Sequence, residues 1–181
     1  MERIETKRYV LRKLIQEDAK DIFEILSDEE VIKNLNMKIH NDIYDTKKLI
    51  DEYLIGFKDG DKYPFAIIDK ETKAFVGVFL IKLDLFDEDC FEFTVYIKKK
   101  FWNQGVYTEV LRSMTKFAFD NVNTGNFRGF VMEKNEASSR VLEKCKFKLE
   151  KIFKVDGIEG NIKSYLMTKE EYETFSEGEN K

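Results

Sequence analysis

The sequence has few of the residues that build disulfide frameworks and metal sites. Two cysteines, one histidine, one proline and one tryptophan occur in 181 residues. A small secreted scaffold would carry more cysteines, and one histidine with two distant cysteines cannot make a typical metal site, so we expect no metal. No apolar run reaches the ~20 residues that cross a bilayer, and the N-terminus lacks a signal-peptide core. We therefore expect a cytoplasmic protein with no membrane partner.

An excess of positive charge is also missing. The chain has 35 acidic and 31 basic residues, a net charge of −4, and 43% of its residues are hydrophobic. A surface that binds nucleic acid needs clustered positive charge, so we expect no nucleic-acid partner. Mild acidity is compatible with a cationic substrate such as an amine. Length and composition predict one domain over residues 1–181, with a polar tail that frays from about Lys169.

The most informative stretch covers residues 90–120. From Cys90 to Ile97 apolar and other residues alternate, which predicts a strand with one packed face. After Gly105 the apolar residues recur at helical spacing, so a helix begins there. A strand that enters a helix through a glycine turn leaves unpaired N–H groups that suit a phosphate. An ordinary strand–turn–helix gives the same pattern, because the phosphate-loop and dinucleotide motifs are both absent.

The rest of the chain predicts strands and helices that interleave. Expected helices cover residues 19–26, a short piece at 31–35, a helix capped by Asp45-Thr46 and ended by Asp59-Gly60, and one that starts at Asn135. Expected strands cover residues 7–14, 63–68, 74–83, 127–132, 147–155 and 158–168, the last two joined by a hairpin turn at Asp156-Gly157. The continuous apolar run at 74–83 predicts a central strand covered on both faces.

Three segments resemble the GCN5-related N-acetyltransferases (GNAT superfamily). Residues 97–109, I-K-K-K-F-W-N-Q-G-V-Y-T-E, resemble the family's acetyl-coenzyme A loop, in the form of the RimJ/RimL-type branch that acetylates protein N-termini, including ribosomal proteins. Residues 135–147, N-E-A-S-S-R-V-L-E-K-C-K-F, resemble its N-x-x-S-x-R-V-L-E-K-x-G-F segment, and residues 164–172 resemble its last strand. The resemblance implies a mixed α/β (α+β) fold with a six- or seven-stranded, mostly antiparallel sheet, splayed at its centre and flanked by helices.

The resemblance also implies a binding site for acetyl-coenzyme A. One part is a strand edge that would pair with the pantetheine arm, one is a loop that would hold the pyrophosphate, and one is the start of the following helix. The implied residues are Val95, Tyr96, Ile97, Trp102, Asn103, Gln104, Gly105, Val106, Tyr107, Thr108, Asn135 and Ser138. The basic run at 98–100 is either a solvated loop or a contact to the 3′-phosphate. The family prefers Gly or Ala at position 107, so Tyr107 is a departure.

Acetyl transfer to an amine needs a group that removes a proton from the ammonium, because a free amine with a pKa near ~10.4 is mostly protonated at neutral pH. We interpret Glu92 as that base, since it lies between aromatic neighbours where partial burial would raise its pKa. A solvated glutamate on a half-exposed strand is the alternative. Asp156 and Glu159 are further candidates, and a backbone N–H near Val95 is a candidate oxyanion donor.

The leaving thiolate needs a proton donor. The resemblance implies Ser138, although a serine at this position also fits a cap at the start of the helix. Other members of the family carry a tyrosine where Leu142 stands, so Tyr107 and Tyr165 are the alternatives to Ser138. The lone His40, in the segment 36–44 that would cover the acceptor, is interpreted as a surface residue.

We therefore predict an acetyl-coenzyme A-dependent N-acetyltransferase, a monomer or homodimer, whose acceptor is a protein or peptide N-terminal amine. A polyamine or another small amine is the alternative acceptor. A non-catalytic coenzyme A-binding sensor or interaction module is the alternative of another class, and it is motivated by Tyr107 and Leu142.

Overall fold

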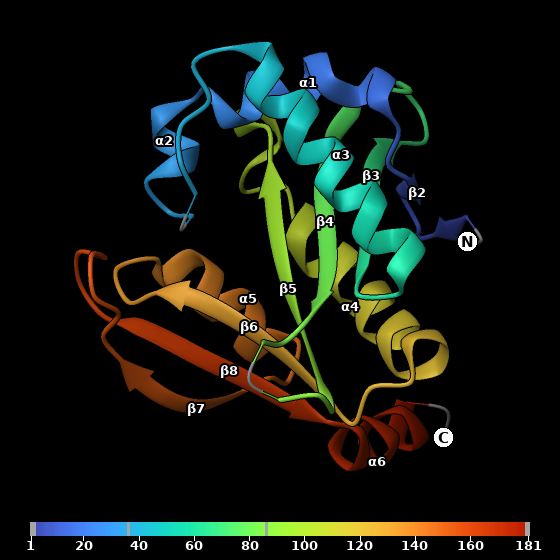
Figure 1. Cartoon of the computed structure of the whole chain (residues 1–181). Coiled ribbons are helices and arrows are strands. Elements are labelled where there is room, and N and C mark those ends of the chain that lie inside the picture. Colours follow the sequence, from blue (N-terminus) through green and yellow to red (C-terminus); the bar gives the residue numbers. More distant parts are fainter. Residues whose placement is uncertain (1–2, 36, 86, 180–181) are drawn as a thin grey trace.

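The computed structural model describes residues 3–35, 37–85 and 87–179 (Figure 1). The strands are β1 Ile4–Glu5, β2 Tyr9–Lys13, β3 Lys62–Asp69, β4 Phe75–Leu83, β5 Cys90–Ile97, β6 Asn126–Met132, β7 Lys148–Phe153 and β8 Ile162–Thr168. The helices are α1 Ala19–Leu26, α2 Glu29–Ile32, α3 Ile43–Asp59, α4 Val106–Phe117, α5 Glu136–Lys144 and α6 Lys169–Glu179, with short helical turns at Gln16–Asp18, Lys99–Phe101 and Ala118–Val122. The predicted segment at 36–44 and the end of the predicted tail each include positions outside the described residues.

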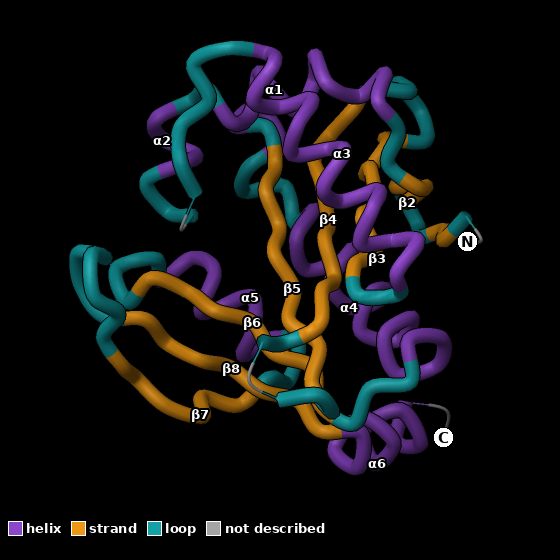
Figure 2. The backbone as a smooth tube through the Cα atoms, in the orientation of Figure 1, coloured by secondary structure: helices purple, strands orange, loops and turns teal. Residues whose placement is uncertain are grey.

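One sheet of eight strands, in the order β1-β2-β3-β4-β5-β6-β8-β7, runs through the molecule. Neighbouring strands are antiparallel except β5 and β6, which are parallel. That parallel pairing joins only Cys90–Phe93 to Asn126–Gly129, and beyond it the two strands diverge (Figures 1 and 2). We call β1–β5 the N-terminal arm and β6, β8 and β7 the C-terminal arm.

The two strands approach closely at the junction because Gly129 has no side chain. A Cβ built on Gly129 would lie 2.6 Å from Cζ of Phe93. The Phe93 ring is itself fixed by aromatic neighbours, since it stacks on Phe79 at 5.6 Å and packs on Phe127 at 4.7 Å between ring centroids. Aromatic packing over a glycine therefore holds the two arms together where their pairing ends.

The two faces of the sheet are covered differently. Helices α4 and α5 cover one face along both arms, and side chains such as Val110, Leu142, Phe127 and Tyr165 form one core cluster there. Helices α1, α2 and α3 cover the other face over the N-terminal arm. Over the C-terminal arm that face carries no helix among the described residues, as Figure 1 shows in front of β6 and β8.

Most predicted elements are confirmed. The strand at 90–97, the helix after Gly105 and the helix after Asn135 begin and end within a residue or two of their expected limits. Strand β4 is buried from Phe75 to Ile81, so the prediction of cover on both faces is confirmed. The fold class is confirmed as well, with eight strands in place of six or seven.

Several local predictions are wrong. The cap of α3 is Asp42, whose side chain accepts from the backbone N–H of Tyr44 at 2.7 Å, and not Asp45-Thr46. Residues 154–161 form a longer loop between β7 and β8 in place of a tight hairpin at Asp156-Gly157. The segment from Lys169 forms α6, because Tyr172 stacks on Phe119 with centroids 4.9 Å apart.

The face of β5 that was expected to be polar is also covered in part. Tyr96 is only 2% exposed and packs with the α1–α3 cluster. Burial raises the pKa of Tyr53 to about 12 and the pKa of Tyr96 above its ordinary range, so both hydroxyls stay protonated at neutral pH. Among the described residues, no helix is both long and apolar enough to span a membrane.

Candidate functional site

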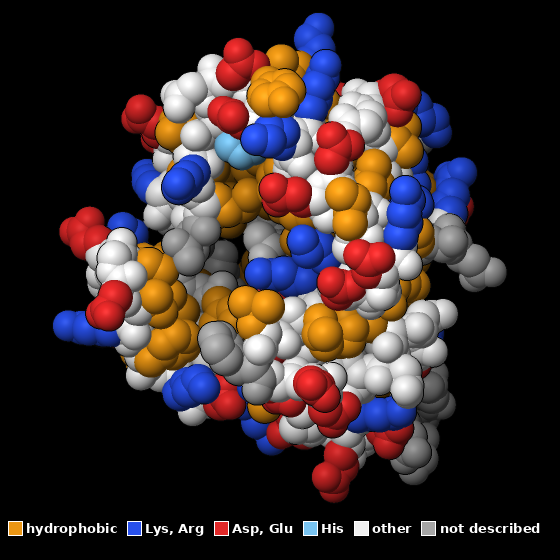
Figure 3. Space-filling model, in the orientation of Figure 1, with side chains coloured by type: hydrophobic (Ala, Val, Ile, Leu, Met, Phe, Trp, Pro, Cys, Tyr) orange, Lys and Arg blue, Asp and Glu red, His pale blue; other side chains and the backbone are white. Residues whose placement is uncertain are grey.

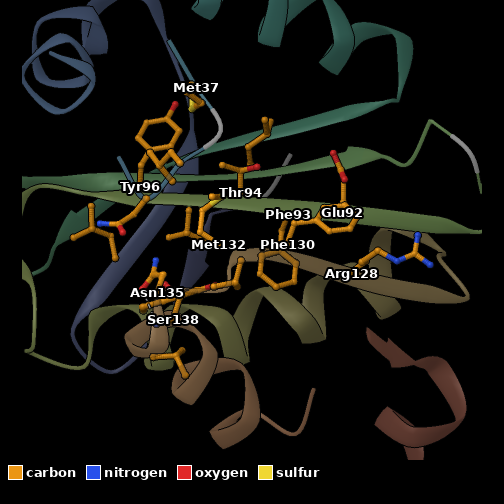
Figure 4. A pocket seen from close by; sticks show the side chains of 18 of the residues that line it. Met37, Glu92, Phe93, Thr94, Tyr96, Arg128, Phe130, Met132, Asn135 and Ser138 are labelled. Carbon is orange, nitrogen blue, oxygen red and sulfur yellow. Dashed lines mark hydrogen bonds between the residues drawn. The ribbon is translucent and has the colours of Figure 1, made fainter. Parts of the chain in front are cut away.

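A cleft of about 1410 Å³ opens where the two arms diverge (Figure 4). Cavities for one small ligand are typically ~300–1,000 Å³, so this cleft has room for two substrates. It brings together most of the predicted site residues, namely Glu92, Val95, Tyr96, Ile97, Trp102, Asn103, Gly105, Val106, Tyr107, Thr108, Asn135 and Ser138. Gln104, Asp156, Glu159 and Tyr165 do not line it.

The turn before α4 has the geometry of an anion site. Gly105 stands at the N-cap in the left-handed region with φ 74°, where glycine is strongly favoured, and Asn103 has φ 58°. The N–H of Glu109 makes the first helical bond, to the Gly105 carbonyl, at 3.1 Å. The N–H groups of the preceding positions in α4 therefore have no partner within the helix, and the helix dipole adds partial positive charge there.

An ion pair from the other end of the chain fixes this turn. Arg8 donates from its backbone N–H and from Nε to the carboxylate of Glu109, each at 2.7 Å, and from Nη1 to the Gln104 carbonyl at 2.9 Å. Thr6 donates to the same carboxylate at 2.7 Å. Burial favours a higher pKa for Glu109, but the hydrogen bonds from Thr6 and Arg8 outweigh it and hold the pKa below its usual value. Sequence reasoning missed this anchor.

The side chains of two loop residues are used within the protein. The side chain of Gln104 donates to the Lys100 carbonyl at 2.7 Å and does not line the cleft, so a contact of Gln104 to a cofactor stays a prediction for its backbone N–H. The indole N–H of Trp102 donates to the Ile97 carbonyl at 2.9 Å, and its ring contacts both core clusters. Trp102 therefore fastens the loop to the end of β5, and the Ile97 carbonyl already accepts one hydrogen bond.

Beyond Phe93, β6 no longer pairs with the edge of β5 that faces the cleft. From Thr94 to Ile97 the strand pairs with β4 only, between Leu80 and Gly77. Backbone groups on the other side of this segment point toward the cleft, as they do at any sheet edge. An extended chain that enters the cleft can pair with this edge as an added strand.

The basic run at 98–100 is tied into the protein. Lys98 is 6% exposed and pairs with Asp21 at 2.7 Å and with Glu24 at 2.5 Å. Lys99 pairs with Glu30. Both interpretations made from the sequence, a solvated loop and a phosphate contact, are wrong for Lys98, whose ammonium is buried and neutralised by two carboxylates.

Asn135 and Ser138 lie at the start of α5, on one wall of the cleft (Figure 4). The side chain of Asn135 accepts from the backbone N–H of Ser138 at 3.1 Å, so Asn135 is the cap. The Ser138 hydroxyl takes no part in that cap, and the interpretation of Ser138 as a capping residue is wrong. The hydroxyl stands at the cleft, where it can donate a hydrogen bond to a ligand.

The two tyrosines proposed as alternatives to Ser138 are held in the interior. Tyr165 is buried and donates to Glu143 at 3.0 Å, away from the cleft. Tyr107 lines the cleft and packs against the main core cluster. Burial, together with the neighbouring Cys145, raises the pKa of Tyr107 above its ordinary range, so this phenol stays protonated.

Glu92 lies in the cleft at the junction of the arms. Its side chain is 15% exposed, as its interpretation as a partly buried carboxylate requires, and it forms an ion pair with Lys82 that the sequence did not indicate. Its neighbour across the parallel pairing is Arg128, which pairs with Asp84 at 2.5 Å and with Glu150 at 3.4 Å. Asp156 and Glu159, the other candidate bases, are exposed in the 154–161 loop outside the cleft.

His40 is not a simple surface residue. Its Nδ1 lies 2.8 Å from the Thr46 hydroxyl, and its backbone N–H donates to the Leu26 carbonyl at 3.0 Å. Burial lowers its pKa. His40 does not line the cleft. Its contact with Thr46 instead holds it against the first turns of α3.

Comparisons with known proteins agree with this geometry. Residues 8–148 match the family described as "Acetyltransferase (GNAT) domain". "Uncharacterized N-acetyltransferase p20" of Bacillus licheniformis is 25% identical over 150 residues, 83% of this chain and 84% of that protein. Two solved structures share the fold at 16% identity. A RimL ribosomal L7/L12 alpha-N-protein acetyltransferase in complex with coenzyme A has a TM-score of 0.81, covering 94% of this chain and 99% of its own. A spermidine N-acetyltransferase from Vibrio cholerae in complex with coenzyme A and spermine has a TM-score of 0.79, covering 91% and 98%.

Proposed function

Because this chain belongs to the acetyltransferase (GNAT) family and is an N-acetyltransferase, we propose that it transfers an acetyl group from acetyl-coenzyme A to the N-terminal amine of a protein or peptide. The observation that carries the proposal is the cleft between the two arms. The lining of the cleft includes the turn before α4, the edge of β5 that β6 leaves unpaired, and side chains of the C-terminal arm.

The residues present fit acetyl-coenzyme A. The turn before α4 needs the left-handed conformation of Gly105, with φ 74°, which a glycine adopts without strain. The N–H groups of Val106, Tyr107 and Thr108 would bind the phosphates. The β5 edge from Val95 would hold the pantetheine arm by strand addition. Both solved structures above were obtained with coenzyme A, which supports the same use of the cleft here.

Each reactive group at the cleft would have one role in acetyl transfer. Glu92 would accept the proton that the ammonium loses, with Lys82 orienting its carboxylate. The neutral amine nitrogen then forms a bond to the acetyl carbon, the carbon–sulfur bond breaks, and the second proton that the nitrogen loses passes to the leaving thiolate. A backbone N–H near Val95 would stabilise the negative charge on the acetyl oxygen. The Ser138 hydroxyl would donate a hydrogen bond to the leaving sulfur.

A peptide acceptor is favoured over a polyamine by the shape and charge of the cleft. A closed pocket that binds a polyamine would need carboxylates with no cationic partner of their own, so that they could pair with the ammonium groups of the ligand. In this cleft Glu92 pairs with Lys82, and Asp84 pairs with Arg128. The ribosomal-protein and spermidine enzymes resemble this chain equally at 16% identity, so the resemblance alone does not choose between them.

Two measurements test the proposal. Titration calorimetry with acetyl-coenzyme A should give micromolar or tighter binding, and thiol release should follow on addition of an N-terminal peptide. Spermidine at the same concentration serves as the competing acceptor. Faster thiol release with spermidine would replace the peptide by a polyamine. Binding of acetyl-coenzyme A without release for any amine would favour the non-catalytic module.

A further inference from the structure

The uncovered face of the C-terminal arm carries a row of apolar side chains beside the candidate acetyl-transfer site. Side chains alternate along β6, so Phe127 and Val131 enter the core while Phe130 and Met132 point to the uncovered face. The apolar side chains on this face that line the cleft are Phe130, Met132, Phe153, Val155 and Ile162. We call this set the apolar shelf.

The shelf is continuous across three strands. Met132 pairs with Ile162, and Ile162 pairs with Phe153, so the three side chains lie in one row. The ring of Phe130 meets the ring of Phe153 edge-on, with centroids 6.0 Å apart. Figure 3 shows hydrophobic side chains gathered over β6, β8 and β7, next to the hollow between the two halves of the molecule.

Two members of the shelf are exposed although they are apolar: Phe130 is 41% exposed and Val155 is 38% exposed. Met132 and Phe153 are half-buried, and Ile162, at 7% exposed, forms the buried floor between them. None of the five belongs to either core cluster. Contiguous exposed apolar groups on a monomer commonly mark a binding surface, because water contact with them is unfavourable.

The wall across the cleft is apolar as well. Val31 of α2, with Leu35 and Met37 after it, lines the cleft from the N-terminal arm. In Figure 4, Met37 lies on the opposite side of the cavity from Phe130 and Met132. A group that enters between the shelf and this wall is therefore contacted by apolar side chains from both arms.

The charges between these two walls do not favour a polycation. Four carboxylates and four cationic side chains line the cleft among the described residues: Asp61, Asp84, Glu88, Glu92, Lys62, Lys82, Arg128 and Lys151. Asp84 and Glu92, whose side chains are 6% and 15% exposed, are each paired with a cation. On the shelf itself Lys151 stands over the Phe153 ring, 5.7 Å from its centroid, and would repel a second positive charge.

We propose that the apolar shelf binds the first side chains of the acceptor peptide, and that the enzyme selects peptides whose first two residues are apolar or aromatic. This inference rests on the proposed function and specifies the acceptor of the same cleft. The peptide amine would point toward Glu92 and the β5 edge, while its side chains displace water from Phe130 and Phe153.

The experiment compares acceptors that differ only at the shelf. Three peptides of equal length begin with two Leu, two Ser or two Lys residues, and spermidine is the fourth acceptor. Thiol release from acetyl-coenzyme A gives kcat/KM for each. We expect the Leu peptide to exceed the other three by about tenfold or more, the range that burial of one or two apolar groups gives in a pocket.

Substitutions on the shelf then test whether the preference for apolar peptides arises there. Phe130→Ala should lower kcat/KM for the Leu peptide by about tenfold, leave the Ser peptide nearly unchanged and keep the affinity for acetyl-coenzyme A. Leu149→Ala is the matched control, because Leu149 is 48% exposed on the same arm but does not line the cleft. Phe130→Leu should restore most of the loss. Thermal unfolding of all three checks that they are folded.

Each outcome is decisive. Equal rates for the Leu and Ser peptides would overturn the role of the shelf while acetylation of peptides stands. A preference for spermidine would overturn both the role of the shelf and the peptide as acceptor. Loss of a dimer in Phe130→Ala, with acceptor preference unchanged, would mean that a second copy covers the shelf and would also overturn the inference. Absence of thiol release with every acceptor, despite binding of acetyl-coenzyme A, would refute the proposed function, and the inference would fall with it.

Discussion

The two arms of the sheet both contain strands rich in apolar residues, but helices cover them differently. Strand β4 in the N-terminal arm is buried on both faces, with Phe79 in one core cluster and Val78 in the other. Strand β6 in the C-terminal arm is also rich in apolar residues, yet Phe127 is buried and Phe130 is 41% exposed. The difference lies in the helices: α1–α3 cover the first arm, and no helix among the described residues covers the same face of the second.

In the proposed function this asymmetry gives the two arms different roles. The covered arm would hold the charged cofactor at the β5 edge and the start of α4. The half-covered arm would bind the acceptor on its exposed apolar surface. The junction of the arms at Glu92 and Gly129 is where the two functions meet, so changes there should separate them most clearly.

The largest expected effect is on turnover, from Glu92→Gln. If Glu92 removes the ammonium proton, this change should lower kcat by about 100-fold or more, because a positioned base contributes about that much. The acidic limb of the pH–rate profile should also disappear, since the group that must be deprotonated is gone. Measurement of kcat from low to neutral pH with a fixed peptide checks both.

The matched control for Glu92 is Glu88→Gln, because Glu88 also lines the cleft but is exposed in the loop before β5. Its profile should keep the acidic limb. An unchanged profile in Glu92→Gln would remove the residue from the mechanism, and its pairing with Lys82 would then be structural.

An effect of similar size, on stability, should follow from Gly129→Val at the junction. A Cβ at this position meets Cζ of Phe93 at 2.6 Å, and Phe93 is held by Phe79, Phe127 and Phe147. The ring cannot move aside, so the change should cost about 3 kcal/mol of the free energy of unfolding. Urea unfolding at neutral pH measures it.

Phe130→Ala on the same strand is the control for that variant. Phe130 is exposed on the uncovered face, so its removal should cost less than about 1 kcal/mol. Equal losses for the two variants would show that the uncovered face is as tightly packed as the junction, and the contrast between the arms would be wrong.

Local pattern was enough to predict much of this structure. The alternation at 90–97, the change of period after Gly105 and the apolar run at 74–83 each reflect burial by near neighbours, and all three are confirmed. The motif at Asn135 also marked a real helix start, although the sequence could not distinguish Asn135 from Ser138 as the cap.

Contacts between distant segments could not be predicted in this way. Arg8 and Glu109 are 101 positions apart, and Lys98 pairs with Asp21 77 positions away. The polar sequence of the tail predicts fraying, because the stacking of Tyr172 on the distant Phe119 cannot be read from the local pattern. The apolar shelf could not be predicted either. A strand sequence such as F-R-G-F-V-M does not indicate whether helices cover one face of the strand or both.

The most selective test of the covered arm is Gly105→Val, for which we expect about a tenfold loss of affinity for acetyl-coenzyme A. Gly105 adopts φ 74°, so a branched side chain would strain the turn. Relief of that strain would move the N–H groups at the start of α4 that would hold the phosphates. Gly60→Val is the matched control, because Gly60 has φ 87° at the end of α3 with no atom within 4 Å of an added Cβ. The two variants should lose similar stability, about 1–2 kcal/mol, but only Gly105→Val should weaken binding in calorimetry. Equal affinities in the two variants would mean that the phosphates bind away from α4, and that the covered arm is not the cofactor side of the cleft.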